Sequence, residues 1–202
     1  SQVQSCGRQS ERIHFLILPE IFRFFFFADS TAAAQRKGGD GRRMDRNKNG
    51  LVLEGGGMRG VYTAGVLDAF LEARLEFDGC LGVSAGSCHA ASYLSGQKGR
   101  AYRVNVAYLK DWRYGSFRSW MKTGDYFGAQ MLYDTIPNQL DPYDYEAFDQ
   151  YPGWFRAVIT NMETGEAEYP LIQDMHRDVV VLRASSSLPL LSRPVLIDGK
   201  PY

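Results

Sequence analysis

The chain has 202 residues, of which 45% are hydrophobic and 13% aromatic, enough for one well-packed core and too few for two large ones. The formal net charge is zero, but basic residues outnumber acidic ones in the first fifty positions and acidic residues outnumber basic ones in the rest. That acidic remainder has no clustered stripe of Lys and Arg, which argues against a nucleic acid as partner.

Residues 1–48 are expected to be a disordered or non-native leader. The apolar run at 15–27 is interrupted by a proline and two charged residues, and it is shorter than the roughly 20 residues that cross a bilayer as a helix. Small residues at 32–34 leave a cleavable signal peptide open as an alternative. Residues 35–49 have almost no apolar side chain, which is typical of a linker, and Met44 is the expected natural start.

The three cysteines point to a reducing, intracellular setting. Cys6, Cys80 and Cys88 form no CxxC pair and have no spacing typical of a disulfide framework or a metal site. The cysteines thus suggest no metal site, and the acyl-transfer reaction inferred below is expected to need no metal and no organic cofactor. The expected location is the cytoplasm or the periphery of a membrane.

The organised domain is expected at residues 49–202, beginning with a strand–helix–strand–helix order. Residues 50–53 are a short apolar run bounded by glycine, as in a buried strand. Apolar residues then recur at helical spacing over 59–73. Residues 80–83 form a second short apolar run, followed by small residues at 85–91 that favour a closely packed helix. The order predicts an α/β fold with helices on both faces of a mainly parallel sheet.

The later segments are less regular. The pattern predicts two helices, an acidic, Tyr-rich connection, a hairpin turning at a Thr-Gly pair, and a final helix stopped by a proline. In chain order these elements lie at 102–112, 129–136, 141–151, 154–169 and 174–185.

The sequence Gly82-Val83-Ser84-Ala85-Gly86 matches the nucleophile elbow, a sharp turn that exposes a serine between a strand and a helix. Glycines on either side of Ser84 remove side chains that would collide in such a turn, and the following helix directs free amide groups toward developing negative charge. A bare GxSxG is more often a turn without chemistry. Its place between a strand and a small-residue helix favours Ser84 as a nucleophile.

A glycine-rich loop follows the first strand, so its backbone N–H groups can converge on an anion. It supplies the candidate oxyanion-hole residues Gly55, Gly56, Gly57, Met58, Arg59 and Gly60. The same spacing fits GxGxxG, whose usual interpretation is dinucleotide binding. That interpretation needs an acidic residue at the end of the second strand, where Ser84 stands instead, while Asp78 precedes the strand. One acyl-transfer site explains both glycine motifs better.

Together the motifs Leu-Glu-Gly-Gly-Gly-Met-Arg-Gly and Gly-Val-Ser-Ala-Gly-Ser resemble the patatin-like phospholipase family, from about Leu51 to the end of the chain. The run Ala184-Ser185-Ser186-Ser187-Leu188-Pro189 resembles a stretch common in its bacterial members. The resemblance implies a three-layer α/β/α sandwich, hydrolysis of ester bonds in lipids, and a Ser-Asp dyad in place of a triad. The expected substrate is a lipid or fatty acyl ester, and transient contact with a membrane surface is compatible with it.

The family's base is the Asp of a late Asp-Gly pair, and the only late pair in this chain is Asp198-Gly199. Its setting resembles a strand, a tight turn and a return strand, so we expect Asp198 to be a turn residue and the chain to end before its general base. The histidines, His14, His89 and His176, are expected to be surface or packing residues rather than a triad base. A catalytically incomplete, lipid-binding fragment is therefore the main alternative to an active hydrolase.

Aromatic residues are dense between Tyr102 and Phe127. They could line an acyl pocket or touch a membrane. We favour the plainer interpretation that most fill the core, because a lipid pocket and a core share one composition.

Overall fold

The computed structural model describes residues 49–202, and the expectations for the leader, Cys6 and His14 lie outside this range. The strands are β1 (Gly50–Leu53), β2 (Gly79–Val83), β3 (Trp154–Thr160), β4 (Ala167–Glu168), β5 (Leu171–Ile172), β6 (Leu196–Ile197) and β7 (Lys200–Pro201). The helices are α1 (Val61–Glu72), α2 (Ala85–Leu94), α3 (Arg100–Val106), α4 (Phe117–Thr123), α5 (Tyr145–Asp149) and α6 (Met175–Ser185). A 3-10 helix, η1 (Gly57–Gly60), and a π-helix, η2 (Met131–Leu140), complete the set.

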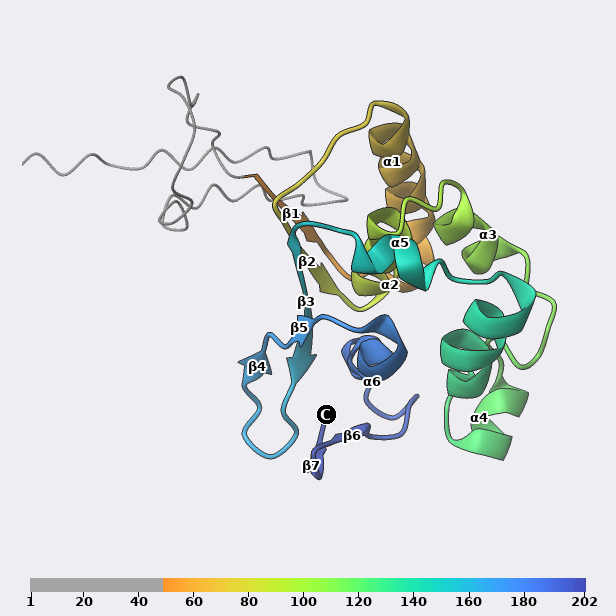
Figure 1. The fold of residues 1–202 in the computed structure, drawn as a ribbon. Helices are drawn as coiled ribbons and strands as arrows, with labels where there is room; N and C mark the ends of the chain where they lie inside the picture. The colour runs from red at the N-terminus through yellow and green to blue at the C-terminus, as the bar shows by residue number, and fades with distance from the viewer. Residues whose placement is uncertain (1–48) are drawn as a thin grey trace, which may run out of the picture.

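The central sheet confirms the predicted α/β class with a mainly parallel sheet. Strands β1, β2 and β3 are parallel neighbours in that order, and the short strands β4 and β5 pair antiparallel with β3. Each parallel connection passes through a helix, as parallel strands require. Over residues 49–202, Figure 1 shows the helices on one side of this sheet, so the second helical layer of the predicted sandwich is not among the described elements.

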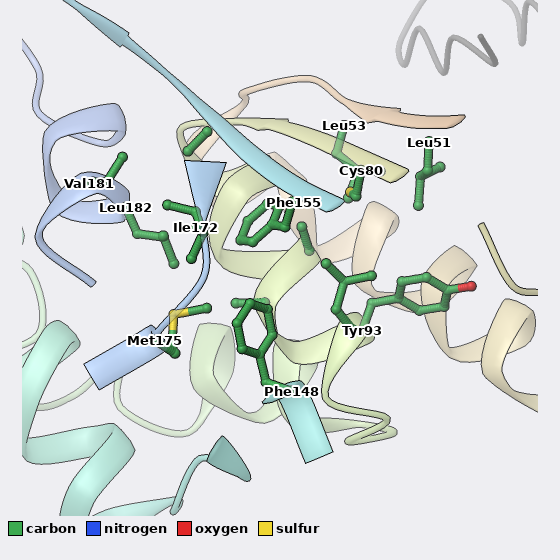
Figure 2. Close-up of a cluster of buried hydrophobic side chains, with 14 of the residues drawn as sticks. Leu51, Leu53, Cys80, Tyr93, Phe148, Phe155, Ile172, Met175, Val181 and Leu182 are labelled. Atoms are coloured by element: carbon green, nitrogen blue, oxygen red, sulfur yellow. The ribbon is translucent and has the colours of Figure 1, made fainter. Parts of the chain in front are cut away.

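The main core lies between the sheet and its covering helices. Alternate strand residues such as Leu51, Leu53 and Phe155 are buried and face α1, α2, α5 and α6, whereas intervening residues such as Arg156 are exposed. Figure 2 shows Phe155 and Phe148 meeting in this core, with their ring centroids 6.2 Å apart. Burying each such side chain contributes roughly 1.5–3 kcal/mol, so this layer holds the carboxyl ends of β1 and β2 in place.

Elements with strong local signals are confirmed. The hairpin of β3 and β4 turns at Gly165, whose φ is +76°. Helix α6 begins after Asp174, whose carboxylate accepts hydrogen bonds from the backbone N–H groups of His176 and Arg177. The helix expected at 102–112 is shorter, because α3 ends at Val106 and turns follow.

Other segments differ from the sequence prediction. The helix expected at 129–136 continues through Pro137 as the π-helix η2, although a proline in a helix removes one backbone hydrogen bond. The connection predicted at 141–151 contains α5, capped by the Asp144 side chain. Helix α4 was not predicted; the Ser116 hydroxyl caps it by accepting a hydrogen bond from the backbone N–H of Ser119.

The segment near Asp198 forms the predicted hairpin. Strands β6 and β7 pair antiparallel around Asp198 and Gly199, whose φ angles are +50° and +80°. Positive φ at both central residues matches the tight turns that favour Asp-Gly. The side chain of Asp198 is exposed there.

Candidate active site

Ser84 stands at a strained turn between β2 and α2. Its φ is +53° and its ψ is −124°, a combination that is uncommon for residues other than glycine and that clusters at functional sites. A Cβ on Gly82 would lie 2.4 Å from the Cα of Ser87, and one on Gly86 would lie 2.4 Å from the carbonyl oxygen of Leu53. Both glycines are therefore required for the close approach of α2 to the sheet.

The glycine-rich loop lies directly against Ser84. A Cβ on Gly55 would be 3.0 Å from the Cβ of Ser84 and 3.7 Å from its Oγ. Among the described residues, the backbone N–H groups of Gly56 and Gly57 have no hydrogen-bond partner. The 3-10 helix η1 follows, and the loop from Gly55 to Arg59 lines the same cavity as Ser84. Free donors beside a hydroxyl are the arrangement that binds a developing oxyanion.

The end of α6 braces the elbow, a contact that sequence reasoning missed. The backbone N–H of Ser84 donates a hydrogen bond of 2.8 Å to the Oγ of Ser185. One turn along α2, the Sγ of Cys88 lies 3.7 Å from the Oγ of Ser186. From the sequence, the serine run at 185–187 indicates only a resemblance to the family. Its contact with the elbow joins Ser185 to Ser84, 101 positions earlier in the chain, so no local pattern predicts it.

A cavity of about 500 Å³ opens beside Ser84. Its walls come from one face of α2, from α3, from η2 and from one face of α6, and they are mostly apolar. The apolar lining includes Val104, Leu132, Ile136, Met175, Val179 and Leu182. Its size and composition suit a small molecule or an apolar chain.

The titratable groups beside Ser84 are held neutral. Burial raises the pKa of the Cys88 thiol, so this side chain is not a thiolate at neutral pH. Burial lowers the pKa of His89 to about 4. The Nε2 of His89 lies 2.7 Å from the Nδ2 of Asn105, and its ring packs against Gly60, the last residue of η1.

No described residue hydrogen-bonds to the Ser84 hydroxyl. His89 is a buried packing residue, and His176 is exposed and stacked on Tyr145, as expected of residues outside a triad. Asp125 is the carboxylate that lines the described cavity, and its oxygens accept from the backbone N–H of Arg193 at 2.8 Å and the guanidinium of Arg183 at 3.5 Å. The hairpin residue Asp198 is not among the lining residues.

The aromatic segment behaves differently from the favoured prediction. Tyr114 is buried beneath η2, as a core residue should be. Phe127 lines the cavity together with Tyr114. The core-filling interpretation is wrong for Phe117, which is 65% exposed on α4.

Comparisons with known proteins agree with this geometry. The family model described as patatin-like phospholipase matches residues 51–202. A relative described as the uncharacterized protein YjjU of Escherichia coli (strain K12) is 34% identical over 158 residues. That match covers 75% of this chain and 43% of the relative, so the chain spans less than half the length of this curated relative. The strained Ser84, the glycine-rich loop against it and the matched family model together show that this chain belongs to the patatin-like phospholipase family.

Proposed function

We propose that this protein is a serine lipid acyl hydrolase whose nucleophile is Ser84. The observation that carries the proposal is the contact between Ser84, held at positive φ, and the glycine-rich loop at the mouth of an apolar cavity. Membership of the patatin-like phospholipase family supports lipid esters as the substrate class. No metal or organic cofactor takes part in the proposed steps.

The Oγ of Ser84 attacks the carbonyl carbon of a fatty acyl ester while a base removes the hydroxyl proton. The carbonyl oxygen becomes an oxyanion, which accepts hydrogen bonds from N–H groups of the loop from Gly55 to Gly60 and is favoured by the N-terminus of α2. The base returns the proton to the departing alcohol as the carbon–oxygen bond breaks. Water then hydrolyses the acyl-Ser84 ester and releases the fatty acid.

The base in this proposal is an aspartate, as the family's Ser-Asp dyad implies. Asp198 stands in an exposed turn, and the oxygens of Asp125 are already engaged with Arg183 and Arg193. We therefore propose that the base is an aspartate other than these two. An active hydrolase needs it within hydrogen-bond reach of Ser84.

The nucleotide-binding alternative finds little support. The loop that fits GxGxxG lies against Ser84 rather than beside an acidic residue at the end of β2. Asp78 instead accepts a 2.7 Å hydrogen bond from the backbone N–H of Asn49 where β2 begins. The lipid-binding alternative is separated from hydrolysis by experiment.

Fluorophosphonate labelling and p-nitrophenyl ester hydrolysis test the proposal on the full-length protein, as wild type, Ser84→Ala and Cys88→Ser. We expect Ser84→Ala to lose labelling and turnover, because loss of a serine nucleophile in other enzymes costs about six orders of magnitude in rate. Cys88→Ser is the matched control and should keep both. Unchanged turnover in Ser84→Ala would remove the assignment, and lipid binding without labelling would favour the lipid-binding fragment.

A further inference from the structure

An exposed apolar patch lies at the edge of the cavity, where α4 meets the loop after α6. Its members are apolar side chains with large exposed areas, namely Phe117, Met121, Leu188, Leu190 and Leu191. The indole N–H of Trp120 donates a 3.0 Å hydrogen bond to the carbonyl of Leu190, which ties the helix to the loop. The backbone N–H of Tyr126 donates to the carbonyl of Leu191 at 2.7 Å. These bonds make the patch one surface rather than scattered residues.

Both the exposure of the Leu190 side chain to water and its backbone conformation cost free energy. Its side chain is 90% exposed, and its φ of +67° lies in the left-handed region that bulky residues rarely adopt. Glycine at this position would remove both costs. Strain of this kind persists where surrounding structure enforces it and clusters at functional sites. A leucine held outward in this way has the properties of an anchor for an apolar environment.

Cations surround the patch, although residues 51–202 are mildly acidic as a whole. The guanidinium of Arg118 and the ammonium of Lys122 lie over the Trp112 ring, at 4.6 Å and 5.2 Å from its centroid. The Arg193 side chain lies against Gly124 at the end of α4. Among residues 49–202 no carboxylate forms an ion pair with Arg118, Lys122 or Arg193. Their charge is therefore available to an external anion.

The patch also borders the proposed catalytic cavity. Leu188 belongs to both surfaces, and Ser187, Ser192 and Phe127 line the cavity beside it. An occupant of the patch would lie next to residues that line the same cavity as Ser84. Lipid esters reside in membranes, so this placement would deliver the substrate directly.

We propose that the apolar patch, with Arg118, Lys122 and Arg193 around it, docks the protein on a membrane surface containing anionic phospholipids. The inference rests on the proposed function for its substrate class and names the surface through which lipid reaches the cavity. Apolar side chains enter the boundary between headgroups and acyl chains, while cations contact the anionic headgroups. Trp112 and Trp120 lie among these groups, as amphipathic rings do at membrane interfaces.

Sedimentation with phosphatidylcholine vesicles, with and without phosphatidylserine, tests the docking surface. All variants are made in Ser84→Ala protein, so a negative result cannot come from lipid hydrolysis or from failed chemistry. Leu190→Gly relieves the strained φ, so it should be at least as stable as its parent and bind both kinds of vesicle roughly tenfold more weakly. If Leu190 instead stabilised the fold, Leu190→Gly would have a lower free energy of unfolding than its parent.

The contribution of the cationic side chains to vesicle binding is measured separately. Arg118→Gln with Lys122→Gln should weaken binding about fivefold for each charge on vesicles with phosphatidylserine, and leave binding to neutral vesicles unchanged. The matched controls are Met162→Ser, an exposed apolar residue after β3, and Arg74→Gln, an exposed residue after α1. Both controls should bind as their parent does. In Figure 1 the turn between β3 and β4 lies well away from α4.

Two results would overturn the proposal. One is vesicle binding by Leu190→Gly equal to that of its parent. The other is a dimer in sedimentation velocity that Leu190→Gly converts to monomer while vesicle binding stays constant, because the patch would then be the interface for a second copy of the chain.

Discussion

Gly86 offers the sharpest test of how the elbow is held. In Gly86→Ala the new Cβ would meet the carbonyl oxygens of Leu53 and Glu54 at 2.4 Å and 2.7 Å. These are main-chain atoms of β1 and its end, so no side-chain rotation relieves the contact. Helix α2 must instead move from the sheet by roughly half an ångström or more, and Ser84 at its N-terminus moves with it.

The expected change in the free energy of unfolding of Gly86→Ala is the sum of two opposing effects. Overpacking against a rigid backbone costs about 3 kcal/mol, and alanine is better than glycine inside a helix by about 1 kcal/mol. The net loss of about 2 kcal/mol should lower the unfolding midpoint by about 4–8 °C in a domain of this size. If Ser84 is the proposed nucleophile, displacing it by a substantial part of an ångström should slow fluorophosphonate labelling by up to about a hundredfold.

Gly65→Ala is the matched control. Gly65 is also a helical glycine, but a Cβ there would meet nothing within 4 Å. The variant should gain about 1 kcal/mol and raise the midpoint by about 2–4 °C, with unchanged labelling. Thermal unfolding followed by circular dichroism measures both variants. If Gly86→Ala is as stable as Gly65→Ala and labels at the wild-type rate, the close approach of α2 to β1 does not position Ser84.

Three further predictions concern Ser185, His89 and Asp198. Ser185→Ala should cost about 1–2 kcal/mol and slow labelling, because it leaves the backbone N–H of Ser84 unpaired, and Ser185→Thr should restore labelling if the hydrogen bond matters. The buried His89 has a pKa of about 4 when folded and about 6.5 when unfolded, so the unfolded state binds more protons between these values. The free energy of unfolding should therefore fall as pH drops through this window, by roughly 3 kcal/mol in total. Chemical denaturation of His89→Asn should show a weaker dependence of this free energy on pH. Equal pH dependence in the two proteins would contradict a buried, neutral imidazole. Asp198→Asn should leave labelling and stability unchanged; robust esterase activity of residues 44–202 alone that Asp198→Asn abolishes would instead identify Asp198 as the base.

Local patterns in the sequence predict several of the strands, helices and turns of the fold. The runs at 50–53 and 80–83 are short, apolar and bounded by glycine, and both are strands. Asp174 and Gly165 mark a helix start and a turn through their own chemistry, and both appear where predicted. The elbow could be located because its two glycines and its serine lie within five consecutive residues, 82–86.

The remaining features depend on contacts between distant segments. Ile136 is fully buried, and η2 continues past it although Pro137 normally ends a helix. The bond from Ser84 to Ser185 and the cavity between α2, α3, η2 and α6 join segments far apart in the chain. The loop that holds Leu190 is tied to Trp120 by a hydrogen bond between residues 70 positions apart, which no local pattern reveals.

Among residues 49–202, no helix has the length and apolar character needed to cross a bilayer.

The central claim is that Ser84 forms an acyl-enzyme, and the most direct measurement is mass spectrometry of the protein quenched during turnover of a fatty acyl ester. We expect the peptide containing Ser84 to carry the mass of the acyl group, and we expect Ser84→Ala to carry none. Two results would contradict the account. One is an acyl group on the neighbouring Cys88, and the other is turnover without any acylated peptide while the hydroxyl of Ser84 stays free.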